Sequence, residues 1–88
     1  MNMLLPGREP LPRIQALLSL TAIKSEAIIA SLEDHYCRGV PLKSAAKING
    51  ADGSNARKAS QQLETVATTV ERIKEMDWAG FKGMQQCA

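Results

Sequence analysis

The side chains best suited to chemistry in this chain are polar and basic residues between positions 42 and 63. Their groups match what a nucleic acid offers, because arginine pairs with a guanine edge or clamps a phosphate, lysine binds phosphate and asparagine reads adenine. Hydroxyl groups and free N–H groups at the start of a helix also bind phosphate oxygens. We therefore predict that this segment binds double-stranded DNA. The predicted DNA-binding residues are Lys43, Lys47, Ser54, Asn55, Arg57, Lys58 and Gln61.

Positive charge is concentrated on the same segment. Between residues 38 and 62 the chain has five basic residues and one acid, a net charge of +4, whereas the remainder has six basic and eight acidic residues, a net charge of −2. The whole chain carries only +2, so the distribution of charge, rather than its total, favours a nucleic-acid partner. A solvated, lysine-bearing surface without a ligand is the alternative interpretation.

The sequence contains no convergent set of catalytic or metal-binding residues. His35, Tyr36 and Cys37 are adjacent, and consecutive helical residues point about 100° apart. One histidine with the distant Cys37 and Cys87 cannot complete a four-ligand zinc site. The Gly50-Ala-Asp-Gly53 sequence matches the GxxG loop of KH RNA-binding domains, but no strand pattern accompanies it. We therefore expect no enzyme activity, no metal and no cofactor.

Four helices are expected to position the polar residues, because apolar side chains recur at helical spacing and no segment alternates as a strand does. The first three are expected at Leu11 to about Ser19, at Ile23 or Lys24 to Arg38, and at Pro41 to Asn49. The fourth begins after an N-cap at Asp52 or, alternatively, at Ser54. The predicted fold class is all-α: a four-helix small domain containing a helix-turn-helix, with a long fourth helix.

Residues 42–63 have the features of the helix-turn-helix itself. Ala45 and Ala46 permit close packing of two helices, and Gly50 stands where the chain must turn sharply. The second helix of such a unit presents its N-terminal side chains to the major groove of DNA. The sequence therefore predicts a DNA-binding protein and not a catalyst.

Three segments are predicted along the chain. Residues 1–10 are expected to form a flexible N-terminal arm, residues 11–76 the helical helix-turn-helix DNA-binding domain, and residues 77–88 an irregular C-terminal tail. A chain of 88 residues has room for one small core, and alanine buries little area, so a lone monomer would be marginally stable. This favours self-association.

A second pattern runs along the fourth predicted helix. Its apolar residues are spaced alternately by three and four positions, as in a coiled coil: Ala56, Ala59, Leu63, Val66, Val70 and Ile73. The first half is expected to pack in its own domain, and the part beyond about Leu63 to bind a partner helix. We expect a homodimer or higher oligomer formed through the first helix, the latter half of the fourth, or both. The alternative function is a helical protein–protein adaptor that uses the 56–73 seam without nucleic acid.

From about residue 13 to 76 the chain resembles the PapB family of fimbrial-operon transcription regulators. The resemblance rests on three features in the same order and spacing: Ser25-Glu26 followed by Ile28-Ile29-Ala30-x-Leu32-x-Asp34, then Tyr36-x-x-Gly39, then the Lys43 to Leu63 unit around Gly50. It implies an all-helical protein that binds A·T-rich DNA upstream of adhesin operons as dimers or larger assemblies. Asn49 departs from the pattern, which has an apolar residue before the turn glycine.

The N-terminal sequence indicates the expected compartment. MNMLL lacks a basic flank and ends at Pro6-Gly7, which is too short for a signal peptide. No run approaches the ~18 apolar residues that a membrane span requires, and the two cysteines form no CxxC motif. We therefore expect no membrane partner and a cytoplasmic, nucleoid-associated location.

Overall fold

The computed structural model describes residues 4–87, and it describes side chains as far as Trp78. The four helices are α1 (Leu11–Leu18), α2 (Glu26–Arg38), α3 (Leu42–Ile48) and α4 (Gly53–Cys87). No strand occurs within this described range. The predicted all-α class, with four helices of which the fourth is long, is confirmed.

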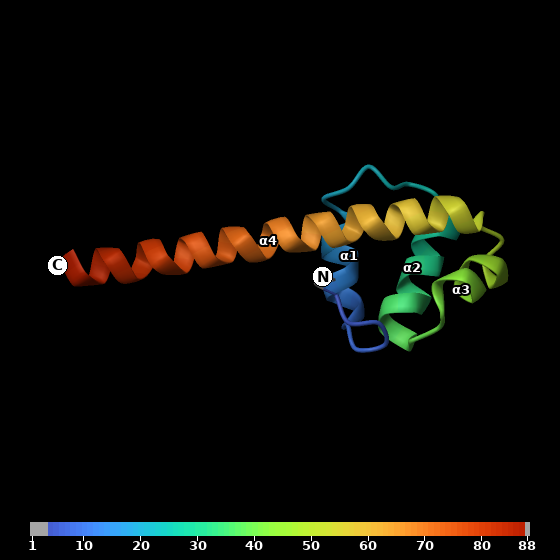
Figure 1. The fold of residues 1–88 in the computed structure, drawn as a ribbon, viewed down its shortest axis with the longest axis horizontal. Helices are drawn as coiled ribbons and strands as arrows, with labels where there is room; N and C mark the ends of the chain where they lie inside the picture. The colour runs from blue at the N-terminus through green and yellow to red at the C-terminus, as the bar shows by residue number, and fades with distance from the viewer. Residues whose placement is uncertain (1–3, 88) are drawn as a thin grey trace.

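The molecule consists of a small head and a projecting helix (Figure 1). Helices α1, α2 and α3 gather around the N-terminal half of α4, and the C-terminal half of α4 extends away from them. The molecule measures 56 × 23 × 22 Å. A helix of 35 residues is about 52 Å long at 1.5 Å per residue, so α4 alone accounts for the longest dimension.

One stripe of α4 closes the core of the head. Ala56, Leu63 and Ala67 are each 0% exposed, and Ala59 is also buried. Val66 and Val70 are partly buried against the same core. The part of the seam between Leu63 and Val70, which the sequence assigned to a partner helix, therefore packs within its own chain.

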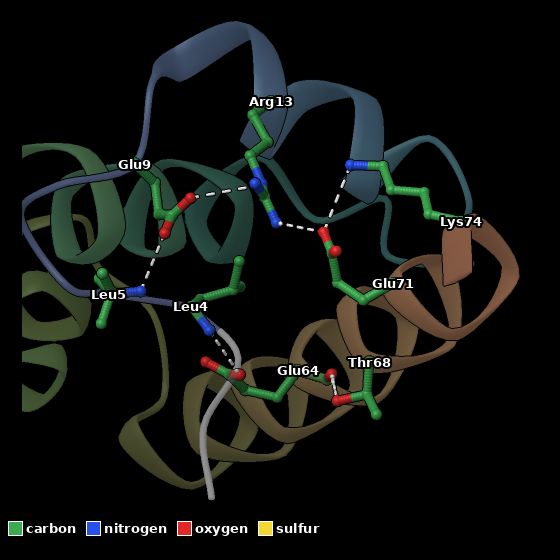
Figure 2. A network of polar contacts seen from close by, with 8 residues as sticks. All are labelled: Leu4, Leu5, Glu9, Arg13, Glu64, Thr68, Glu71 and Lys74. Atoms are coloured by element: carbon green, nitrogen blue, oxygen red, sulfur yellow. Dashed lines mark hydrogen bonds and ion pairs between the residues drawn. The ribbon is translucent and has the colours of Figure 1, made fainter. Parts of the chain in front are cut away.

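The N-terminal segment is part of this core. Leu4 is fully buried, and its N–H donates to Glu64 Oε2 at 3.1 Å (Figure 2). The Gly7 N–H donates to the His35 carbonyl at 3.2 Å, and the Glu9 N–H to the Tyr36 carbonyl at 3.1 Å. The Tyr36 carbonyl lies in the last turn of α2, where the helix leaves carbonyls without a partner, whereas the His35 carbonyl also accepts the Gly39 N–H at 3.2 Å. The prediction of a flexible arm is wrong for residues 4–10, while residues 1–3 lie outside the described range.

Two glycines allow this segment to lie against α2. Gly7 and Gly39 both adopt a left-handed conformation, with φ of 78° and 77°, which costs glycine little. A Cβ atom on Gly7 would lie 3.0 Å from the Gly39 Cα. The N-terminal segment and the end of α2 therefore approach closely enough that side chains would hold them apart.

Two predicted helix boundaries need correction. Helix α2 begins at Glu26, not at Ile23 or Lys24, because the Ser25 side chain caps it by accepting the Ile28 N–H. Helix α4 continues to Cys87, so the predicted irregular tail is wrong for residues 77–87, and residue 88 is not described. Isolated glycines weaken a helix by about 1 kcal/mol each but do not end it, and the sequence has no proline beyond Pro41.

A chain of ion pairs attaches α1 to the middle of α4 (Figure 2). Arg13 lies 3.3 Å from Glu71 and 3.4 Å from Glu9. Lys74 approaches the same Glu71 oxygen at 3.3 Å. The network therefore fastens the head to α4 close to the point where this helix leaves the head.

Candidate nucleic-acid interface

The turn between α3 and α4 is built around Gly50. Its φ is 71°, and its N–H donates to the Lys47 carbonyl at 3.3 Å while the Ala51 N–H donates to the Ala46 carbonyl at 2.8 Å. This pair of bonds is the Schellman motif, which ends a helix and reverses the chain. The next helix begins at Gly53, so Asp52 occupies the predicted N-cap position, and its carbonyl accepts the Ala56 N–H at 2.9 Å.

Helix α3 is held against α2 by small residues and one side-chain clamp. Ala45 and Ala46 are buried as predicted, and Ser31 of α2 is 0% exposed beside them. Asn49 donates to Asp34 Oδ2 at 2.9 Å and to the Ala45 carbonyl at 2.8 Å. The asparagine that departs from the family pattern therefore joins the end of α3 to α2. No local signal in the sequence predicts this bond, because its partners lie 15 positions apart.

Four of the predicted DNA-binding residues share one exposed face of α4. They are spaced as i, i+3, i+4 and i+7, which places them along one side of a helix: Ser54, Arg57, Lys58 and Gln61. All four are exposed, and this side is opposite the buried stripe of Ala56 and Leu63. Asn55 is exposed too, but it lies about 100° around the helix from Ser54, on the flank of the face. The structure therefore separates Asn55 from the other four.

A hollow of about 530 Å³ lies between the start of α3 and the start of α4. Its lining residues are Leu42, Lys43, Gly53, Ser54 and Arg57. It brings a cation from each helix together with a hydroxyl group and the N-terminal end of α4, a combination that suits an anionic oxygen. Lys47 is exposed one turn beyond Lys43 but does not line the hollow. Sequence reasoning did not identify Leu42, whose partly buried side chain packs against the core.

The cations of this region carry unneutralised charge. Among the side chains that the structure describes, none of Lys43, Lys47, Arg57 and Lys58 forms an ion pair. Arg13, Arg38 and Lys74, in contrast, are paired with carboxylates. Arg38 pairs with Asp34 at 3.3 Å at the end of α2. Four cations without an ion pair among the described side chains therefore lie on α3 and the first turns of α4.

A partly buried polar network fixes α4 beneath this face. The Tyr36 hydroxyl lies 2.7 Å from Ser60 Oγ and donates to Glu64 Oε1 at 3.1 Å. Burial, and then the charge of Glu64, raises the pKa of Tyr36 to about 12 although the Ser60 hydrogen bond lowers it. The phenol is therefore a neutral donor at ordinary pH. These contacts hold the N-terminal half of α4 at one rotation, with its polar face outward.

The part of the chain that the structure describes offers no metal site and no membrane span. Within the described residues no group of three histidine, cysteine, aspartate or glutamate side chains is placed to hold a metal ion. No helix in the same range combines the length and apolar character needed to cross a bilayer. Comparison with protein-family models, curated proteins and solved structures gave no match.

Proposed function

We propose that this protein is a DNA-binding transcription regulator in which α3 and α4 act as a helix-turn-helix. One observation carries the proposal: Ser54, Arg57, Lys58 and Gln61 form an exposed face at the start of α4, and the unpaired Lys43 stands beside it across the hollow. A recognition helix requires this combination of a buried stripe on one side and donors on the other.

Each group has a distinct part in the proposed complex. Ser54 and the N-terminal end of α4 bind a phosphate oxygen, with Lys43 alongside. Arg57 reaches a guanine edge or a phosphate, and Gln61, one turn further along, reaches a base or the backbone. Lys47 and Lys58 add backbone contacts, which supply affinity and make it depend steeply on salt. Asn55, on the flank of the face, reaches a base only if α4 lies tilted in the groove.

The resemblance to the PapB family supports a specific setting. We propose that the protein binds A·T-rich sites upstream of a fimbrial or adhesin operon, selecting them by sequence or by groove shape. Occupying repeated sites near a promoter would alter access for polymerase or other regulators. The protein would then act in the cytoplasm, associated with the nucleoid.

Fluorescence anisotropy tests the proposal directly. An A·T-rich duplex and a mixed-sequence duplex of equal length are titrated at about 50 mM and about 200 mM salt, a range over which phosphate contacts lose much of their affinity. We expect tighter binding of the A·T-rich duplex and a large loss of affinity at the higher salt. Equal affinity for both duplexes contradicts the A·T preference alone. No binding at low salt contradicts the function and favours the adaptor.

A further inference from the structure

The projecting half of α4 carries large apolar side chains that its own head does not cover. Ile73, Met76 and Trp78 are 50%, 63% and 59% exposed, and the C-terminal end of α4 has none of the other three helices beside it (Figure 1). A helix segment of this length gains little from hydrogen bonding alone and usually depends on tertiary contacts. A partner that covers these side chains would therefore stabilise it.

An apolar groove lies where α4 leaves the head. It has a volume of about 200 Å³ between α1 and α4 and is lined by Arg13, Ala16, Leu17, Leu20, Val70 and Lys74. Leu20, just after α1, is 63% exposed. Because this groove adjoins the start of the projecting half, a partner lying along α4 would also cover Leu20.

The charges on this face identify the occupant. Leu63, Val70 and Asp77 are spaced by seven residues, and Lys74 lies three positions before Asp77, so all four are on one side of α4. Asp77 forms no ion pair among the described side chains, and the Lys74 side chain is 63% exposed despite its contact with Glu71.

Opposite charges one turn apart make this face complementary to itself in one direction only. If a second copy lies antiparallel, with the twofold axis between positions 75 and 76, each Lys74 faces the other copy's Asp77, giving two equivalent pairs. In a parallel arrangement in register, lysine would face lysine and aspartate would face aspartate. Both arrangements have twofold symmetry, the commonest symmetry of homodimers, so it is the charges that favour the antiparallel one.

We infer that the face of α4 beyond Val70, together with Leu20, binds a second copy of this chain in antiparallel orientation. Ile73 and Trp78 flank the charged pair and supply the apolar contact. This interface does not involve the α3–α4 face, so it forms whether or not the protein binds DNA.

The test compares charge reversals on the two sides of the helix by sedimentation velocity over micromolar concentrations. Asp77→Lys places lysines opposite each other twice and should weaken dimerisation about tenfold or more, because two attractive pairs become two repulsive ones. Glu75→Lys makes the same charge change about 130° away from the Lys74–Asp77 face and should leave the dimer intact. Circular dichroism confirms that each variant is helical.

Rescue tests whether the charges at positions 74 and 77 act across the interface. The double variant Lys74→Asp/Asp77→Lys exchanges the two charges and should restore the dimer, because each pair reforms with its members swapped. An equimolar mixture of Lys74→Asp and Asp77→Lys chains should associate more tightly than either alone. A monomeric wild-type protein, equal effects of Glu75→Lys and Asp77→Lys, or a double variant weaker than Asp77→Lys would each overturn the inference.

Discussion

Arg57 is the single residue whose position best distinguishes a base contact from a phosphate contact. It lies one turn into α4, is exposed, and lines the hollow shared with Lys43 and Ser54. In the proposed complex, a side chain this close to the N-terminal end of α4 is placed to reach base edges. Its truncation therefore reports on specificity as well as on affinity.

Replacing Arg57 with alanine should weaken DNA binding by about 1–3 kcal/mol if the guanidinium reads a base. The loss should differ between an A·T-rich and a mixed duplex, because a base contact depends on sequence. Arg72→Ala is the matched control, since Arg72 is exposed on α4 fifteen positions further along and removes the same charge. Anisotropy titrations at moderate salt measure both, and an Arg57 variant with unchanged affinity would remove this residue from the site.

Tyr36 makes stability sensitive to alkali. Its pKa is about 12 in the folded protein against an ordinary value of 10.0, so the unfolded chain loses the proton first. The stabilising contribution of the neutral phenol is complete below about pH 10 and is lost as pH rises toward 12. The loss in the free energy of unfolding is about 1.4 kcal/mol at pH 11.

Tyr36→Phe should lack this component. Urea unfolding at about pH 9 and about pH 11 should show the wild type losing about 1.4 kcal/mol more than the variant. Lysine titration affects both proteins equally, so the difference between them isolates the phenol. Equal losses would mean that Tyr36 ionises normally in the folded state.

At the level of elements, the turn between α3 and α4 depends on one backbone conformation. Gly50 has a φ of 71°, and a Cβ atom added to it would meet nothing within 4 Å, while Gly53 has equally open space without the positive φ. Gly50→Ala should therefore lower the free energy of unfolding by about 1 kcal/mol through backbone strain alone. Gly53→Ala should change it by less than about 0.5 kcal/mol. Similar values in thermal or urea unfolding would show that the turn relaxes.

The elements that sequence predicted well are those set by local conformation. Gly39 and Gly50 mark the ends of α2 and α3 because left-handed φ is cheap for glycine and little else. The features that the sequence did not predict include distant contacts and weak local signals. The Asn49–Asp34 clamp joins two helices, and the continuation of α4 past Trp78 follows from the absence of any strong breaker.

The candidate site was predictable as residue types but not as a surface. Helical spacing alone groups Ser54, Arg57, Lys58 and Gln61, and the structure leaves this face exposed. The sequence could not show that Lys43 and Arg57 line the same hollow, because this depends on the angle at which α3 turns into α4. The seam beyond Leu63 was expected to bind a partner helix. It packs within its own chain instead, with Ala67 0% exposed, because α1 and α2 both pack against α4.

For the molecule as a whole, the N-terminal segment contributes to stability. Leu4 is 0% exposed, whereas Leu5, its neighbour, is 58% exposed. Leu4→Ala should cost about 2–5 kcal/mol of unfolding free energy, as a buried leucine does. Leu5→Ala should cost less than about 0.5 kcal/mol. Urea denaturation measures both variants. Equally small effects would support the prediction of a flexible arm.

The contacts of this segment also determine when the head can fold during translation. Leu4 bonds to Glu64, and Arg13 to Glu71, across separations of 60 and 58 positions. A ribosome adds about 5–20 residues per second, so a span of about 60 residues takes roughly 3–12 seconds, whereas helices form in about a microsecond. Through that interval α1, α2 and α3 have no α4 stripe to cover Ile14 and Leu32, both of which end fully buried. The nascent chain therefore exposes its core until Glu71 has been synthesised and has left the ribosome, and this is the period in which a chaperone would bind it.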